Sequence, residues 1–230
     1  MRLLGRSRMR SSWRTLRHNA SHMQTSVVTQ GLDHLAAVDP VMEALIAEHG
    51  PPRELFSRRR GRSRFELLAE SICYQQLAGK AAEAIWRRVV ALTDGPFTPE
   101  AVLAVGAAPL RAAGFSNAKT ASVLDLASKV ASGDVRLERI GRLDDEAVIA
   151  QLVTVRGIGR WTAEMFLMFT LHRPDVWPVG DLGVRAGYGR AYGFATIPSA
   201  KELAPLGDRF RPWRSLAAWY CWRVVQPIPI

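Results

Sequence analysis

The sequence predicts an all-α protein, and three observations support this fold class. Apolar residues recur every three or four positions along most of the chain, whereas the alternating pattern of a β-strand is scarce. Proline, serine, threonine and aspartate stand where helices would start, and glycine stands where they would end. The segments between the apolar stretches are short, as in compact helical domains. We therefore expect about ten helices, without a linker or a simple repeat.

The first predicted helix begins at Asp39-Pro40, an N-cap followed by a first helical proline, and it ends at Gly50-Pro51. Residues 53–63 are basic and contain glycine, which indicates a loop. Two apolar helices follow, with a break near Ala78-Gly79 between them. Their periodic residues are Phe65, Leu68 and Ile72 in the first helix, and Ile85, Trp86, Val89 and Leu92 in the second.

Start signals mark the remaining helices. Thr98-Pro99 opens one helix, and Ser116 caps another that ends at Gly133. Asp144 caps the next one. The last two helices are expected to start at Pro198-Ser199 and at Pro212. The residues expected to face inward after Ser116 and Asp144 are Val123, Leu126, Ala127, Val130, Val148, Ile149 and Leu152.

The composition limits the class of protein. With 230 residues, of which 48% are hydrophobic and 23% charged, the chain fits an ordinary globular protein rather than a collagen, a coiled-coil rod or a disordered chain. No apolar run reaches the length of about 18 residues that predicts a transmembrane helix. Two cysteines, Cys73 and Cys221, exclude a disulfide framework and four-cysteine zinc or iron–sulfur sites. Their apolar context predicts buried free thiols of an intracellular protein.

The net charge of +10 favours a polyanionic partner, most simply nucleic acid. An anionic membrane surface would require a basic amphipathic helix, and the sequence has no clear one. The histidines show no metal-ligand spacing, so we expect no catalytic metal; they are His18, His22, His34, His49 and His172.

Residues 1–30 are expected to form a basic, disordered arm, and residues 31–230 to form the folded domain, with apolar patterning from near Leu32. Residues 1–22 hold six arginines and no acidic residue, and therefore supply six of the ten net positive charges. Three interpretations stay open. The segment is an arm that touches phosphates, an organellar transit peptide, or an upstream extension before a true start at Met23.

The most informative local segment is Gly157-Ile158-Gly159, which connects two predicted helices almost without a loop. The glycines permit a tight turn and a close approach to a ligand, and Ile158 would be buried between the helices. The free N–H groups of the second helix suit a phosphate oxygen. This is a helix–hairpin–helix pattern, which holds a DNA backbone without reading sequence. An ordinary glycine turn is the alternative.

About twenty residues further on stands Trp177-Pro178-Val179-Gly180-Asp181. Together with the hairpin, this segment closely resembles the helix–hairpin–helix, Gly/Pro-rich, Asp superfamily of DNA glycosylases, and within it the 3-methyladenine DNA glycosylase II branch, which repairs alkylated DNA. The resemblance extends from Phe65 to Trp222. It implies a two-lobed helical fold with the active-site cleft between the lobes, without the extra β-rich N-terminal domain of some members. Three more segments match, the wedge at 72–78, a turn at 113–119 and the C-terminal helix at 211–222.

The resemblance implies hydrolysis of the N-glycosidic bond of alkylated bases, which leaves an abasic site. The transition state is oxocarbenium-like, so a nearby carboxylate can stabilise it and position water. Asp181 matches the catalytic position, at an expected helix N-terminus where negative charge is favoured. A simple N-cap is the alternative, and the two roles are compatible. Bifunctional members carry a Schiff-base lysine where this chain has Trp161, so strand cleavage is not expected.

The resemblance also implies a substrate pocket. Trp161 and Trp222 match pocket-lining positions, where an aromatic face can stack on a cationic alkylated purine that is flipped out of the duplex. Met165 stands where some relatives carry an aromatic residue, and it is expected in the same pocket. Core packing is the alternative for each tryptophan, and it is our expectation for Trp86, Trp213 and Trp219.

DNA contacts are expected from two segments. Gln76 matches the wedge that fills the gap left by the flipped base, with Leu77 beside it; bridging between helices is the alternative for Gln75 and Gln76. Phosphate contacts are expected from the hairpin residues Arg156, Gly157, Gly159 and Arg160, and from Lys119. The family hairpin also holds a structural cation through backbone carbonyls, here those of Val153, Val155 and Ile158.

The expected partner is double-stranded DNA with alkylated bases, bound by a monomer that needs no cofactor and no membrane. The expected location is the cytoplasm of a prokaryote, at the nucleoid. Three alternatives remain. A non-catalytic helix–hairpin–helix protein that binds damaged DNA would tolerate replacement of Asp181. A glycosylase/lyase of the oxidised-base branch would need an amine in the pocket. A basic helical scaffold would have no role on DNA.

Overall fold

The structure is a computed structural model that describes residues 22–52, 55 and 61–225. Within these ranges the secondary structure is helical and contains no strand, so the predicted all-α class is confirmed. The chain divides into two compact units. One unit combines Met1–Ser57 with His172–Ile230, and the other is the central segment Arg58–Leu171. No described helix is both long enough and apolar enough to cross a membrane.

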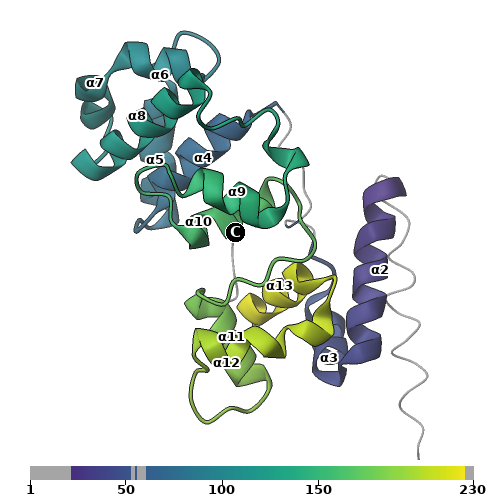
Figure 1. The fold of residues 1–230 in the computed structure, drawn as a ribbon. Coiled ribbons are helices and arrows are strands. Elements are labelled where there is room, and N and C mark those ends of the chain that lie inside the picture. The colour runs from purple at the N-terminus through teal and green to yellow at the C-terminus, as the bar shows by residue number, and fades with distance from the viewer. Residues whose placement is uncertain (1–21, 53–54, 56–60, 226–230) are drawn as a thin grey trace, which may run out of the picture. The chain divides into compact units, whose positions relative to one another are not determined.

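The central unit is built around one long helix, α8, which packs against α4, α6 and α7 (Figure 1). Its aromatic core joins the ring of Phe97 to Phe65, at a centroid distance of 5.7 Å, and to the buried Trp86 at 5.1 Å. Its elements are α4 (Arg64–Tyr74), α5 (Gly79–Val90), α6 (Pro99–Val105), α7 (Ala107–Ala112), α8 (Asn117–Ser132), η2 (Ile140–Arg142), α9 (Asp145–Leu152) and α10 (Arg160–Phe169).

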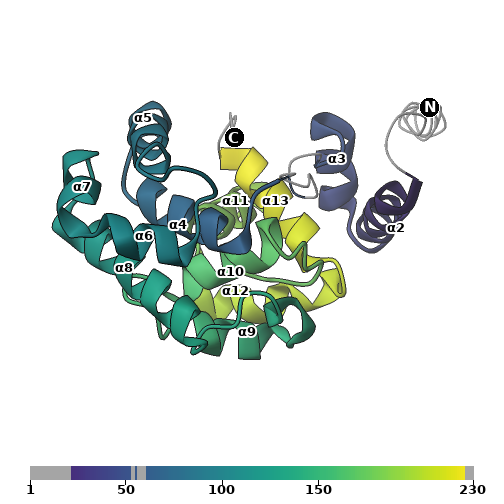
Figure 2. The ribbon, with the colours of Figure 1, turned by 90° about the horizontal axis from the view of Figure 1, so that it is seen from above.

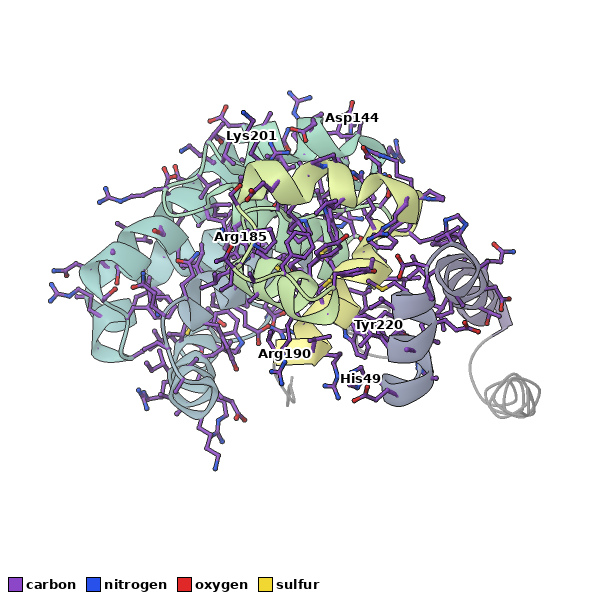
Figure 3. The ribbon with its side chains drawn as sticks, turned by 90° about the horizontal axis from the view of Figure 1, so that it is seen from below. His49, Asp144, Arg185, Arg190, Lys201 and Tyr220 are labelled. Carbon is purple, nitrogen blue, oxygen red and sulfur yellow. The ribbon has the colours of Figure 1, made fainter. Side chains whose placement is uncertain are left out.

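The other unit joins the two ends of the chain. Its elements are α2 (His22–Val38), α3 (Pro40–His49), α11 (Leu182–Ala191), α12 (Ala200–Leu206), η3 (Asp208–Phe210) and α13 (Arg214–Val225). Helices α2 and α3 lie side by side, and α11 lies along α13 (Figures 1 and 2). The Tyr220 hydroxyl of α13 donates a 2.8 Å hydrogen bond to the carbonyl of Gly50, just after His49 at the end of α3 (Figure 3).

Backbone approach between α11 and α13 is unusually close because α11 carries glycines on the facing side. A Cβ atom on Gly187 would lie 1.8 Å from the carbonyl oxygen of Cys221. Any side chain at this position would therefore collide with backbone rather than with a movable side chain. Gly187 thus fixes the separation of the two helices that carry Asp181 and Trp222.

Most of the predicted helix starts are confirmed, but the last helix, α13, begins at Arg214 rather than at the predicted Pro212. Side chains of Asp39, Thr98, Ser116, Asp144 and Ser199 each accept a hydrogen bond from a backbone N–H in the first turn that follows. The predicted stops at Gly50 and Gly133 are also confirmed. Helix caps can be predicted from the sequence because they depend on neighbours within three residues.

Other predicted boundaries differ from the structure. Helix α2 begins at His22, well before the expected start near Leu32, in a stretch whose polar residues give no apolar periodicity. The described residues form twelve α-helices and two short 3₁₀ turns rather than ten helices, partly because α6 and α7 are separated only by Gly106. Residues 1–21 of the predicted arm lie outside the described residues.

Candidate active site

Asp181 is the N-cap of α11, and it follows a tight turn that begins at Trp177. Its backbone N–H donates to the carbonyl of Pro178 at 2.9 Å. The Oδ1 atom of the carboxylate accepts two hydrogen bonds, one from the N–H of Val184 at 2.7 Å and one from the Nε1–H of Trp222 at 2.8 Å. The side chain caps the helix, as the N-cap interpretation predicted, and two N–H groups donate to its carboxylate. With 9% of its surface exposed, Asp181 is held firmly just below the surface.

Trp222 therefore lies directly beside the predicted catalytic carboxylate. It is half-buried on α13 and packs against the first turn of α11. A Cβ atom on Gly183 would lie 2.8 Å from Cδ1 of the indole, so only glycine leaves room for the ring. The structure brings these two predicted residues, Asp181 and Trp222, into contact. The neighbouring Leu182 is 60% exposed.

The other two predicted pocket residues belong to the central unit. Trp161 is on the first turn of α10, and 47% of its surface is exposed, which is unlike a core tryptophan. Met165 follows one turn later on the same helix and is half-buried. By contrast, Trp86 and Trp219 are buried, as expected for packing residues, and Trp213 is half-buried.

The hairpin between α9 and α10 has the predicted form. Ile158 is buried with 4% exposure, while Arg156, Gly157 and Gly159 are exposed. Gly157 has a φ of 76°, and a Cβ atom there would lie 2.4 Å from the hydroxyl of Ser122 on α8. Gly159 caps α10 without a side-chain hydrogen bond. A helix N-terminus without a capping side chain suits an anion, and the contact of this one with phosphate stays a prediction.

Two residues of α8 that the sequence pattern did not predict hold this hairpin in place. Asp125 Oδ2 accepts hydrogen bonds from the backbone N–H of Arg156 at 2.7 Å and from Nζ of Lys129 at 2.8 Å. Lys129 also donates to the carbonyl of Thr154 at 2.6 Å. Burial alone would raise the pKa of Asp125, but the donors from Lys129 and Arg156 outweigh it and lower that pKa. The hairpin is thus fixed by a carboxylate that stays charged.

The wedge segment connects α4 to α5, and both predicted residues in it are exposed. Gln76 has a φ of 57°, the left-handed conformation that is uncommon outside glycine, and Leu77 is 39% exposed. Gln75, which was not assigned to the site, donates from Nε2 to the carbonyl of Gly157 at 3.1 Å and to the Thr162 hydroxyl at 3.4 Å. It ties the wedge segment to the hairpin, so bridging is its role.

Two predicted phosphate contacts already have partners within the protein. Arg160 donates from Nη1 to Glu146 at 3.0 Å and from Nε to Glu164 at 3.1 Å. Lys119 donates to the carbonyl of Cys73 at 2.6 Å, at the end of α4. Their contact with phosphate stays a prediction. Arg156 is exposed on the hairpin, and its contact with phosphate is likewise a prediction.

The structure also bears on thiol chemistry and on metal binding. Both cysteines are buried, and burial raises the pKa of Cys73 to about 11 and also raises that of Cys221, so neither is a thiolate nucleophile at neutral pH. Within the described ranges no three His, Cys, Asp or Glu side chains gather as metal ligands. Of the three hairpin carbonyls expected to hold a cation, that of Val155 also accepts a hydrogen bond from the N–H of Ile158, at 3.1 Å. A carbonyl has a second lone pair, so this bond is compatible with the predicted ion.

Comparison with known proteins gives consistent matches. The family model described as HhH-GPD superfamily base excision DNA repair protein matches residues 69–212. The DNA-3-methyladenine glycosylase 1 of Schizosaccharomyces pombe is 35% identical over 199 residues, which cover 85% of this chain and 87% of that protein.

Two solved structures are similar along most of their length. A Schizosaccharomyces pombe 3-methyladenine DNA glycosylase in complex with abasic DNA has a TM-score of 0.73 and 32% identity, covering 84% of this chain and 95% of the other. A DNA-3-methyladenine glycosidase from Bacillus halodurans has a TM-score of 0.76 and 32% identity, covering 86% and 89%.

Proposed function

Because this chain belongs to the HhH-GPD superfamily of base excision DNA repair proteins, we propose that it acts as a DNA-3-methyladenine glycosylase. It excises alkylated bases by hydrolysing the bond between the base and C1′ of deoxyribose. The observation that carries this proposal for the chain itself is the carboxylate of Asp181, fixed at the N-terminus of α11 by Val184 and Trp222.

Asp181 has the chemistry that this reaction needs. As the base leaves, positive charge develops on the sugar, and a carboxylate held close to C1′ stabilises that charge. The same carboxylate can orient the attacking water. A fixed group is more effective than a mobile one because it needs no reorganisation during the reaction. The two N–H donors to Oδ1 provide that rigidity.

The flipped base is expected between aromatic and apolar groups. Trp161 is exposed, as a stacking residue must be, and Met165 lies one turn further along α10. An alkylated purine such as 3-methyladenine carries positive charge, which strengthens its attraction to an indole face. The same charge weakens the glycosidic bond, so a hydrolytic enzyme needs no covalent intermediate with these bases.

The reaction is proposed to end at an abasic site. In members that also cleave the strand, a lysine follows the hairpin and forms a Schiff base with the sugar, and here that position is Trp161. We expect wild-type protein to release methylated purines from methylated duplex DNA and leave the strand intact until alkali is added. Chromatography identifies the bases, and denaturing gels detect the breaks. Strand breaks without alkali, together with borohydride trapping of a covalent complex, would instead indicate a lyase.

DNA is proposed to bind across the exposed hairpin and the wedge segment of the central unit. Arg156, Gly157 and the first turn of α10 would contact phosphates, and Gln76 with Leu77 would fill the gap left by the base. These two segments are joined by Gln75, which donates to the carbonyl of Gly157. A duplex substrate and a monomeric enzyme are part of the same proposal.

The hydrogen bond by which Gln75 links the wedge segment to the hairpin can be tested with Gln75→Glu. This substitution keeps the shape of the side chain but replaces the donor with a carboxylate oxygen close to the Gly157 carbonyl. Loss of that bond, plus repulsion, is expected to weaken binding to DNA with an abasic site by about tenfold, since a hydrogen bond contributes about 1 kcal/mol. Fluorescence anisotropy with labelled duplex measures the change.

The matched control is Gln151→Glu, which adds the same charge elsewhere in the same unit. The side chain of Gln151 accepts through Oε1 from the N–H of Arg136 at 3.0 Å, and a glutamate can still accept there. We expect this variant to bind nearly as wild type does. Equal weakening in both variants would show that the added charge, rather than the hydrogen bond from Gln75 to Gly157, determines affinity for DNA.

A further inference from the structure

The hydrogen bond between Trp222 and Asp181 is directional. An indole has one N–H donor, which points along a single direction in the ring plane, and it cannot accept. Bonds from a neutral donor to a charged oxygen are stronger than neutral pairs. Oδ1 receives this bond at 2.8 Å and the bond from the Val184 N–H at 2.7 Å. Two donors on one oxygen restrict rotation of the carboxylate about its last single bond.

The packing of α11 against α13 leaves room for the hydrogen bond between Trp222 and Asp181. Gly183 lies between the two partners, and a Cβ atom there would lie 3.1 Å from both Nε1 of Trp222 and Oδ1 of Asp181. Gly187, one turn further along α11, allows the backbone of α13 to approach at Cys221. Both glycines are on the side of α11 that faces α13. Larger residues would push the indole away from the carboxylate.

We propose that Trp222 is a positioning residue that orients the carboxylate of Asp181 through its Nε1–H. The proposal rests on the proposed catalytic role of Asp181 and deepens it. A stacking role needs only the flat face of the ring, whereas positioning needs the N–H group. The two roles are therefore separated by substitutions that retain an aromatic ring and remove the donor.

The first test is Trp222→Phe. The expected loss is about tenfold or more in the single-turnover rate of 3-methyladenine release, the range for loss of one hydrogen bond to a charged group. Affinity for duplex DNA with an abasic site is expected to change less than about twofold, because this ligand has no base on which the ring of residue 222 could stack. A rate equal to that of wild type would overturn the proposal.

Phenylalanine is smaller than tryptophan, so a second variant is needed to separate loss of the N–H donor from loss of packing. Site-specific incorporation of 3-benzothienylalanine at position 222 keeps both fused rings and replaces the N–H group with sulfur. The same loss of rate is expected, with thermal stability close to that of wild type. A wild-type rate in this variant would mean that size, not the donor, matters, and would also overturn the proposal.

Trp177→Phe is the matched control in the same unit. Trp177 is 7% exposed, and its Nε1–H donates to the carbonyl of Leu203 at 3.1 Å, so the substitution removes a comparable indole bond away from Asp181. We expect lower thermal stability and a nearly unchanged rate in the folded protein. If this control lost as much rate as Trp222→Phe, the effect of Trp222 would be structural only.

Failure of this proposal can be told apart from failure of the proposed function. If wild-type protein releases no base, the glycosylase function itself is wrong. If it does, Trp222→Phe is combined with Asp181→Asn and the residual rates are compared. Coupled residues give effects that do not add. Adding Trp222→Phe to Asp181→Asn should therefore change little, whereas a full further tenfold loss would show that Trp222 acts independently of Asp181.

Discussion

Asp181→Asn is expected to stop base release almost completely and leave DNA binding intact. The amide keeps the shape of the side chain, and its oxygen can still accept from Val184 and Trp222, but the negative charge is lost. Removing one group that stabilises transition-state charge lowers rates by about 100- to 1000-fold. Single-turnover release of 3-methyladenine measures the rate, and anisotropy with abasic duplex measures binding. A variant that retained a tenth of the wild-type rate would argue against direct stabilisation by Asp181.

Asp144→Asn is the control for this substitution. Asp144, which is labelled in Figure 3, caps α9 through a 2.8 Å hydrogen bond from the N–H of Ala147, and Asp181 caps α11 through a 2.7 Å hydrogen bond from the N–H of Val184. Both variants exchange a capping carboxylate for an amide, which also caps well. We expect Asp144→Asn to release bases at nearly the wild-type rate. The contrast separates the charge at Asp181 from its capping role. If neither substitution lowered the rate while both proteins still bound DNA, a non-catalytic damage-binding protein would become the better hypothesis.

The parts of the site that depend on near neighbours could be predicted from the sequence. Asp181 stands before an apolar run, and a cap at that position follows from the N–H of Val184 three residues later. Burial of Ile158 follows likewise from its place between two glycines. Such features depend on local backbone geometry, which short patterns specify.

The contacts between distant segments could not be predicted in this way. Gln75 and Gly157 are 82 positions apart, and Asp125 and Arg156 are 31 apart. Nothing in the local pattern distinguishes Gln75 from Gln76, although one ties two segments together and the other is exposed. Asp125 and Lys129 have the spacing of an ordinary helix ion pair, so only the fold reveals that they hold the hairpin.

Gly187→Ala is expected to have the largest effect on stability. In an exposed helix this change would be favourable by about 1 kcal/mol, because alanine is the better helix former. Here the new methyl group would lie 1.8 Å from the Cys221 carbonyl oxygen, so the two backbones must separate. The expected net loss is about 3 kcal/mol, equivalent to a fall in Tm of about 6–12 °C. Thermal unfolding followed by circular dichroism measures it.

The same separation of α11 and α13 is expected to weaken the bond from Trp222 to Asp181, so Gly187→Ala should also lose rate below its Tm. Gly79→Ala provides the comparison for stability, because a Cβ atom at Gly79, the first residue of α5, meets nothing within 4 Å. That variant should be as stable as wild type or slightly more so. Loss of stability in Gly187→Ala with a full rate would mean that the carboxylate of Asp181 is held independently of the helix packing. Loss of both would mean that the glycines of α11 set the geometry of the site.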